Sequence, residues 1–165
     1  MSLTACFTGH RPGKLGGYDP NNQVNLKIRT ALHNKIAEAI SYNITTFISG
    51  GALGVDQWAA ESVLSYRDID ARIKLIIARP FPSQASKWPK DSQAYYQTLL
   101  ARADKVVDIS PDPYSVNKMQ LRNTWMVDQS HAIIAVWDGI EAGGTWGCIK
   151  YAKEKGKLIE YINTK

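Results

Sequence analysis

The stretch ISGGALGVDQWAAE, Ile48–Glu61, places three glycines and one carboxylate between a short apolar run and an apolar-rich helical segment. A tight turn that packs closely needs small residues. A backbone cradle for a phosphate needs them too, because a missing Cβ lets N–H groups approach an anion. The spacing of Gly50, Gly51 and Gly54 matches neither G-x-G-x-x-G nor the P-loop, which requires Lys followed by Ser or Thr. The stretch therefore predicts a strand, a turn and a helix, and both roles of its glycines stay open.

The rest of the chain repeats this alternation. Short apolar runs that are typical of buried strands lie at residues 3–8, 45–48, 72–78, 105–109, 132–137 and 157–162. Segments that favour helices lie at residues 24–41, 55–66, 92–103, 117–129 and 143–155. Strands that alternate with helices are typical of a parallel sheet covered by helices on both faces. We expect one α/β domain over residues 1–165, a Rossmann-like, doubly wound and mainly parallel sheet.

Candidate ligand-binding segments follow the predicted strands. In a doubly wound sheet, ligands bind at the carboxyl ends of the strands, where the strand order reverses. Those ends lead into TGHRPGKLGGY, SGGALGVD, RPFPSQASKW, SPDPYS and DGIEAGGTW, which are rich in glycine, arginine and aromatic residues. The pair Gly143 and Gly144, followed by Thr145, opens the last predicted helix. Two glycine-rich helix N-termini at one sheet edge favour a ligand that carries phosphates, such as a nucleotide. They therefore favour the phosphate cradle over the tight turn as the role of Gly50, Gly51 and Gly54.

Individual side chains add to this interpretation. Arg11 and Arg122 are candidate phosphate clamps. Asp56 either complements a helix dipole or accepts a hydrogen bond from a ribose hydroxyl, and Phe81 either stacks on a base or caps the core. His10 is assigned a binding role, because the sequence shows no nucleophile or orienting acid beside it. The predicted ligand-binding residues are Gly9, His10, Arg11, Ser49, Gly50, Gly51, Gly54, Asp56, Phe81, Arg122, Gly143, Gly144 and Thr145.

Composition limits the classes of protein that fit. With 165 residues, 44% hydrophobic and 21% charged, the chain is typical of one globular domain. The net charge of +5 suits an anionic ligand, and the lysines at 150, 153, 155 and 157 are typical of a solvated helix end. Nucleic acid is therefore not expected as a partner. Whether the chain forms a homo-oligomer is left open.

No metal, cofactor or membrane partner is expected. Cys6 and Cys148 lie in apolar segments without metal-ligand spacing, so buried reduced thiols are predicted. The N-terminus lacks the basic region and the apolar length of a signal peptide, and no run approaches the ~18 apolar residues of a membrane span. These features predict a soluble, cytoplasmic protein.

Five motifs carry a resemblance that covers nearly the whole chain. FTGHRPGKLGGY, SGGALGVDQWAAE, RPFPSQASKW, LRNTWMVDQSHAIIAVWDG and GGTWGCIKYAKEKGK occur in this order. They resemble the YpsA-type branch of the bacterial SLOG superfamily, which is named for the SMF/DprA and LOG proteins. The resemblance implies a Rossmann-like fold and a nucleotide-like ligand, such as ADP-ribose, NAD or a nucleotide sugar, in a sensing or regulatory role in a bacterium or phage.

The departures from the superfamily's enzymes leave catalysis undecided. LOG enzymes carry P-G-G-x-G-T-x-x-E, and aligning that G-T with Gly144 and Thr145 places Cys148 where the glutamate belongs. The stretch MQLRN resembles the LOG segment with its active-site arginine, which points to Arg122. An N-glycosidase of the phosphoribohydrolase type, with Asp56 or Glu141 as the acid, is one alternative to a binding protein. DprA-like nucleic-acid binding and a protein adaptor are others. No catalytic residue is assigned.

Overall fold

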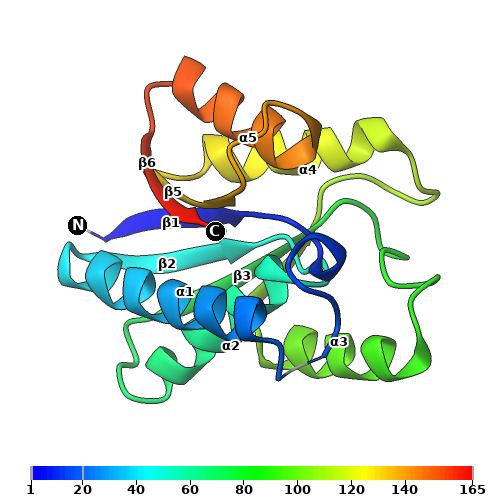
Figure 1. The fold of residues 1–165 in the computed structure, drawn as a ribbon, viewed down its shortest axis with the longest axis horizontal. Coiled ribbons are helices and arrows are strands. Elements are labelled where there is room, and N and C mark those ends of the chain that lie inside the picture. The colour runs from blue at the N-terminus through cyan, green and yellow to red at the C-terminus, as the bar shows by residue number, and fades with distance from the viewer. Residues whose placement is uncertain (1, 20, 165) are drawn as a thin grey trace.

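A computed structural model describes residues 2–19 and 21–164 as a six-stranded parallel sheet with helices on both faces (Figure 1). The strands are β1 (Leu3–Thr8), β2 (Ile44–Ser49), β3 (Lys74–Arg79), β4 (Lys105–Asp108), β5 (Ala132–Trp137) and β6 (Leu158–Asn163). The helices are α1 (Gln23–Ser41), α2 (Val55–Arg67), α3 (Lys90–Arg102), α4 (Val116–Asp128) and α5 (Gly143–Glu154), with a 3₁₀ turn, η1 (Pro12–Lys14). Each predicted element is present, and each boundary lies within two residues of its prediction.

The strand order is β4-β3-β2-β1-β5-β6, and every pair of neighbours is parallel. Helices α1, α2 and α3 cover one face, and α4 and α5 cover the other (Figure 1). The direction of winding reverses between β1 and β5, so this is the switch point at which doubly wound sheets bind their ligands. The prediction of a doubly wound, Rossmann-like α/β fold is confirmed.

Two apolar clusters hold the helices to the sheet. Under α1, α2 and α3, the rings of Phe7 and Phe47 stack with centroids 5.9 Å apart. Under α4 and α5, Met126 and Cys148 pack with Cys6. Both cysteines are free and buried, as predicted. Burial raises the pKa of Cys148 to about 11, so its thiol is protonated near neutral pH.

The first helix shows how local sequence fixes an element. The Asn22 side chain accepts hydrogen bonds from the backbone N–H groups of Val24 and Asn25, which would otherwise have no helical partner. The apolar residues Ile28, Leu32 and Ile36 then recur at intervals of four and are buried on one face of α1. In the described part of the chain, no helix is both long enough and apolar enough to span a membrane.

Candidate functional site

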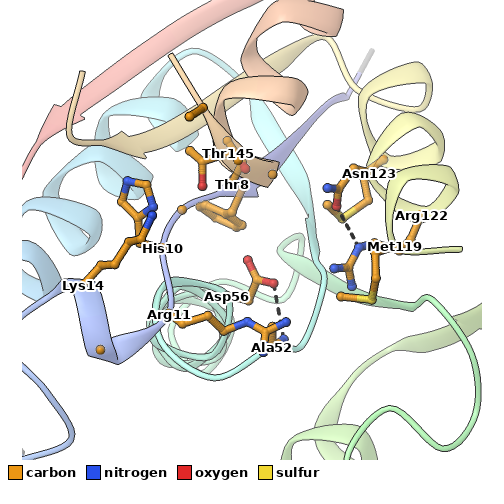
Figure 2. Close-up of a pocket in the computed structure, with 17 residues that line it drawn as sticks. Thr8, His10, Arg11, Lys14, Ala52, Asp56, Met119, Arg122, Asn123 and Thr145 are labelled. Atoms are coloured by element: carbon orange, nitrogen blue, oxygen red, sulfur yellow. Dashed lines mark hydrogen bonds between the residues drawn. The ribbon is translucent and has the colours of Figure 1, made fainter. Parts of the chain in front are cut away.

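A cavity of about 420 Å³ opens at the switch point, at the carboxyl end of β1 (Figure 2). Its walls come from four segments that are distant in the sequence: β1 and the turn after it, the start of α2, α4, and the first turn of α5. The lining residues are Phe7, Thr8, Gly9, His10, Arg11, Gly13, Lys14, Ala52, Asp56, Met119, Arg122, Asn123, Met126, Ala142, Gly143, Gly144 and Thr145. Eight of the predicted binding residues therefore meet in one cavity: Gly9, His10, Arg11, Asp56, Arg122, Gly143, Gly144 and Thr145.

A buried arginine and a buried carboxylate form one wall of the cavity. The Arg122 side chain is 4% exposed, and its Nη1 donates to the carbonyl oxygens of Gly50, at 2.7 Å, and Ala78, at 3.2 Å. Burial raises the pKa of Asp56, and the nearby Arg122 charge opposes that rise. Burial likewise lowers the pKa of Arg122, and Asp56 opposes that change. Each charge therefore stabilises the other in a place where water cannot.

Hydrogen bonds within the SGGALGVD turn satisfy several of its own polar groups. Ser49 Oγ donates to the backbone oxygen of Asp56 at 2.7 Å and accepts from the Gly51 N–H at 3.2 Å. The Ala52 N–H donates to Asp56 Oδ2 at 3.3 Å. These N–H groups, which could have faced an anion, are thus bonded within the protein. Ser49 and Gly51 lie outside the residues that line the cavity.

Close packing explains two further glycines of this turn. A Cβ on Gly50 would lie 2.6 Å from Arg122 Nη1, so a side chain there would displace the arginine. Gly54 has φ of +94°, and a Cβ on it would lie 2.7 Å from the backbone oxygen of His10. Both residues also lie outside the cavity lining. The sequence favoured a phosphate cradle for these glycines, whereas the contacts at Gly50 and Gly54 require them for packing.

The first turn of α5 has the opposite character. Gly143 and Gly144 are exposed at the cavity, and a Cβ on either would have no described atom within 4 Å. The N-cap residue, Ala142, has no side chain that could accept from the first N–H groups of the helix. An uncapped helix N-terminus carries a partial positive charge and free donors, which favour an anion. This turn is the part of the cavity best suited to a phosphate.

Two exposed cations line the same cavity from η1 and the residue before it. Arg11 and Lys14 line the cavity, and Figure 2 shows Arg11 reaching from the β1 turn toward Ala52, below Asp56. Together with Arg122 they give the cavity three basic side chains. Lys14 was not among the predicted residues. The sequence RPGK contains Pro and Gly, which are typical of a turn, and so could have indicated that Lys14 lies in a turn after β1.

His10 has an acidic neighbour that the sequence did not reveal. The imidazole is buried, and its Nε2 lies 3.5 Å from Asp138 Oδ2 without forming a hydrogen bond within the described part of the chain. Burial lowers the pKa of His10, and Asp138 partly offsets this effect. Asp138 follows β5, 128 residues later in the chain, so only the pairing of β1 with β5 brings the two together.

Three other residues considered from the sequence lie elsewhere. Phe81 is 4% exposed and contacts Tyr114 edge to face, with centroids 5.7 Å apart, in a neighbouring cavity. Cys148 is buried against the core cluster, and Glu141 is exposed outside the lining. Asp56 is therefore the candidate acid that the cavity contains. Among residues 2–19 and 21–164, no cluster of His, Cys, Asp and Glu could hold a metal ion.

Fold and site define a doubly wound α/β protein with a basic cavity at its switch point. The chain belongs to the YpsA family: the family model, described as the YspA SLOG family, matches residues 5–164. A UPF0398 protein of Bacillus cereus (strain B4264) is 32% identical over 155 residues, which cover 93% of this chain and 84% of the relative. The SPbeta prophage-derived protein YoqJ of Bacillus subtilis (strain 168) is 38% identical over 145 residues, which cover 81% of this chain and 84% of the relative.

Solved structures agree on the fold. DNA processing protein A of Helicobacter pylori, described with a single-stranded DNA binding mode, aligns with a TM-score of 0.63 at 18% identity. DprA of Streptococcus pneumoniae aligns with a TM-score of 0.65 at 15% identity. The alignments cover 96% and 97% of this chain, but only 64% and 50% of those longer proteins. At this identity the likeness establishes the Rossmann-like fold and no more.

Proposed function

We propose that this protein binds a nucleotide or a nucleotide-derived ligand in the switch-point cavity, with a sensing or regulatory role. One observation carries the proposal: the uncapped N-terminus of α5 lines the same cavity as Arg11, Lys14 and Arg122. Free N–H donors, a helix dipole and three cations are together suited to phosphate groups. The volume of about 420 Å³ lies within the range of roughly 300–1,000 Å³ that is usual for small-molecule sites.

Polar groups beside this basic region suit a sugar. The hydroxyl-bearing residues Thr8 and Thr145 and the carboxyl group of Asp56 line the cavity with the cations. Hydroxyls donate and accept hydrogen bonds, and a carboxylate accepts them, so together they match the hydroxyls of a ribose. ADP-ribose, NAD and nucleotide sugars combine this sugar with phosphates. They are the ligands that we propose to test first.

Adding such a ligand should raise the melting temperature. Binding at 100 times the dissociation constant should increase the free energy of unfolding by about 2.7 kcal/mol. The measurement is a thermal-shift titration with AMP, ADP-ribose, NAD, UDP-glucose and a single-stranded oligonucleotide at near-physiological salt. Failure of every nucleotide to shift the midpoint at millimolar concentration would overturn the proposal. Submicromolar binding of the oligonucleotide alone would instead favour a nucleic-acid site.

A matched pair of substitutions locates the phosphate. Gly144→Asp places a carboxylate in the first turn of α5, where it should repel the ligand yet suit the helix dipole in the free protein. Gly147→Asp adds the same charge one turn later, outside the cavity lining. We expect Gly144→Asp to abolish the ligand-induced shift without lowering the melting temperature of the free protein. Gly147→Asp should retain most of the shift.

Turnover of nucleoside monophosphates is not expected. Hydrolysis of an N-glycosidic bond needs a carboxylate to activate water or to stabilise the ribosyl cation. Cys148 is a buried, protonated thiol and cannot supply that group. The Asp56 carboxylate is buried, accepts from the Ala52 N–H and is stabilised by the charge of Arg122. Incubation with AMP, followed by chromatography, should show no free adenine above background. Adenine release that Asp56→Asn abolishes would prove this expectation wrong.

A further inference from the structure

A second cavity adjoins the first. Its volume is about 580 Å³, and Arg11 and Met119 line both cavities. Figure 2 shows these two side chains on opposite sides of the switch-point cavity, Arg11 near the β1 turn and Met119 on α4. The second cavity lies between the loops that follow β3 and β4. A ligand that fills the switch-point cavity therefore has a neighbouring space into which it can extend past Arg11.

The loops around this second cavity are held together by hydrogen bonds. Asp112 Oδ1 accepts from both the N–H and the hydroxyl of Ser83, at 2.9 and 2.5 Å. Lys118 Nζ donates to the carbonyl oxygens of Pro111 and Pro113, each at 2.7 Å. These bonds join the loop after β3 to the loop after β4 and tie the latter to α4.

The Gly50 carbonyl group links a residue of the first cavity to a residue of the second by hydrogen bonds. The carbonyl oxygen of Gly50 accepts from Arg122 Nη1, at 2.7 Å, and from Gln84 Nε2, at 3.0 Å. Arg122 lines the first cavity and Gln84 lines the second. Gln84 in turn accepts from the Tyr96 hydroxyl at 2.8 Å. The relative position of the two cavities is therefore set by one buried and two partly buried hydrogen bonds.

The second cavity offers an aromatic surface. Tyr114 lines it with 62% of its surface exposed, while the buried Phe81 supports the ring from the side, edge to face. Trp88, also in the lining, packs edge to face on Tyr96 with centroids 5.1 Å apart. Phe81 is thus the support, and Tyr114 presents the free ring. A planar group can stack on such a ring whatever its exact substituents.

We propose that the second cavity is the subsite for a planar ring of the ligand, which stacks on Tyr114 while its phosphates extend past Arg11 to the α5 N-terminus. This inference rests on the proposed function, and it narrows the ligand class. The ligand combines a planar ring, a sugar and more than one phosphate, because it reaches across two cavities. Tyr114 and Trp88 then determine which ring is accepted. Small phosphates without a ring occupy the first cavity alone.

Calorimetry with two probes tests the assignment. ADP-ribose carries the ring, and ribose 5-phosphate lacks it. Tyr114→Ala should raise the dissociation constant of ADP-ribose at least about ten-fold, since loss of one stacking partner commonly has that effect. The same change should leave the affinity for ribose 5-phosphate nearly unaltered. Tyr114→Phe keeps the ring and should retain the affinity for ADP-ribose.

The control is Tyr42→Ala, which removes another exposed tyrosine, 72% exposed, at the C-terminal end of α1. It should alter neither affinity. If ADP-ribose and ribose 5-phosphate bind the unmodified protein but Tyr114→Ala changes neither constant, the ring subsite is wrong and the proposed function stands. If neither probe and no nucleotide in the thermal-shift panel binds, the proposed function itself fails, and this inference fails with it.

Discussion

Replacing Arg122 by methionine is expected to lower the free energy of unfolding by about 3–5 kcal/mol, the usual cost of leaving a buried charge without its compensating charge. Methionine replaces the aliphatic stem of the arginine, but it is shorter and cannot donate to the Gly50 and Ala78 carbonyl oxygens. It also leaves the buried Asp56 without its main opposing charge. Urea unfolding followed by circular dichroism measures the loss. Arg102→Met, at an arginine on α3 whose side chain is 51% exposed, should have little effect.

The double variant Arg122→Met, Asp56→Asn separates charge from packing. If the uncompensated carboxylate causes most of the loss, neutralising Asp56 should restore part of the stability that Arg122→Met removes. If Asp56→Asn restores none of the lost stability, the loss would instead come from the carbonyl oxygens of Gly50 and Ala78, which no longer have their donor. A loss below about 1 kcal/mol for Arg122→Met alone would contradict the buried pair described here, because that is the range of exposed pairs.

Substituting Gly54 by alanine should destabilise the fold by about 3 kcal/mol, because two penalties act together. The residue has φ of +94° and ψ of −130°, a region that side-chain-bearing residues rarely adopt. A Cβ would also lie 2.7 Å from the backbone oxygen of His10 and 2.9 Å from the Pro12 ring. These contacts can be relieved only if the turn after β1 moves. That turn contains Arg11, which lines the cavity. Ligand affinity should therefore fall with stability.

Gly147→Ala is the matched comparison. Gly147 lies within α5, and a Cβ there would have no described atom within 4 Å. Alanine should stabilise the protein by about 0.4–1 kcal/mol, because it restricts the unfolded chain and favours the helix. We expect thermal unfolding to show a lower melting temperature for Gly54→Ala and a higher one for Gly147→Ala. A neutral outcome at Gly54 would show that the turn can adopt another conformation without cost.

The periodicity of the chain predicted the fold well, since each strand and helix is a local pattern. The short apolar runs and the four-residue recurrence of Ile28, Leu32 and Ile36 need no knowledge of distant residues. The switch-point rule then placed the candidate site at the sheet edge where the cavity opens. Glycine content alone, however, did not separate the packed turn at Gly50 and Gly54 from the open one at Gly144. That difference depends on which atoms lie within 3 Å of an absent Cβ.

The residues that the sequence did not reveal are those defined by long-range contacts. Asp138 lies beside His10 because β5 pairs with β1, and no spacing rule connects two residues 128 positions apart. Tyr114 is an exposed aromatic residue in a proline-containing loop, a pattern that many surface loops share. Its position against Phe81 follows from the order of β3 and β4 in the sheet. Both assignments therefore required the tertiary structure.

The central position of β1 has a consequence for synthesis on the ribosome. Residues 3–108 contain β1 to β4 and can assemble four of the six strands while the rest of the chain is still being made. Until β5 emerges, the second edge of β1 has no partner, and an unpaired apolar edge is a template for aggregation. The α5 turn that we propose to bind phosphate emerges later still. We therefore expect nascent chains to depend on chaperones during this interval, and a ligand to stabilise only chains whose synthesis has passed α5.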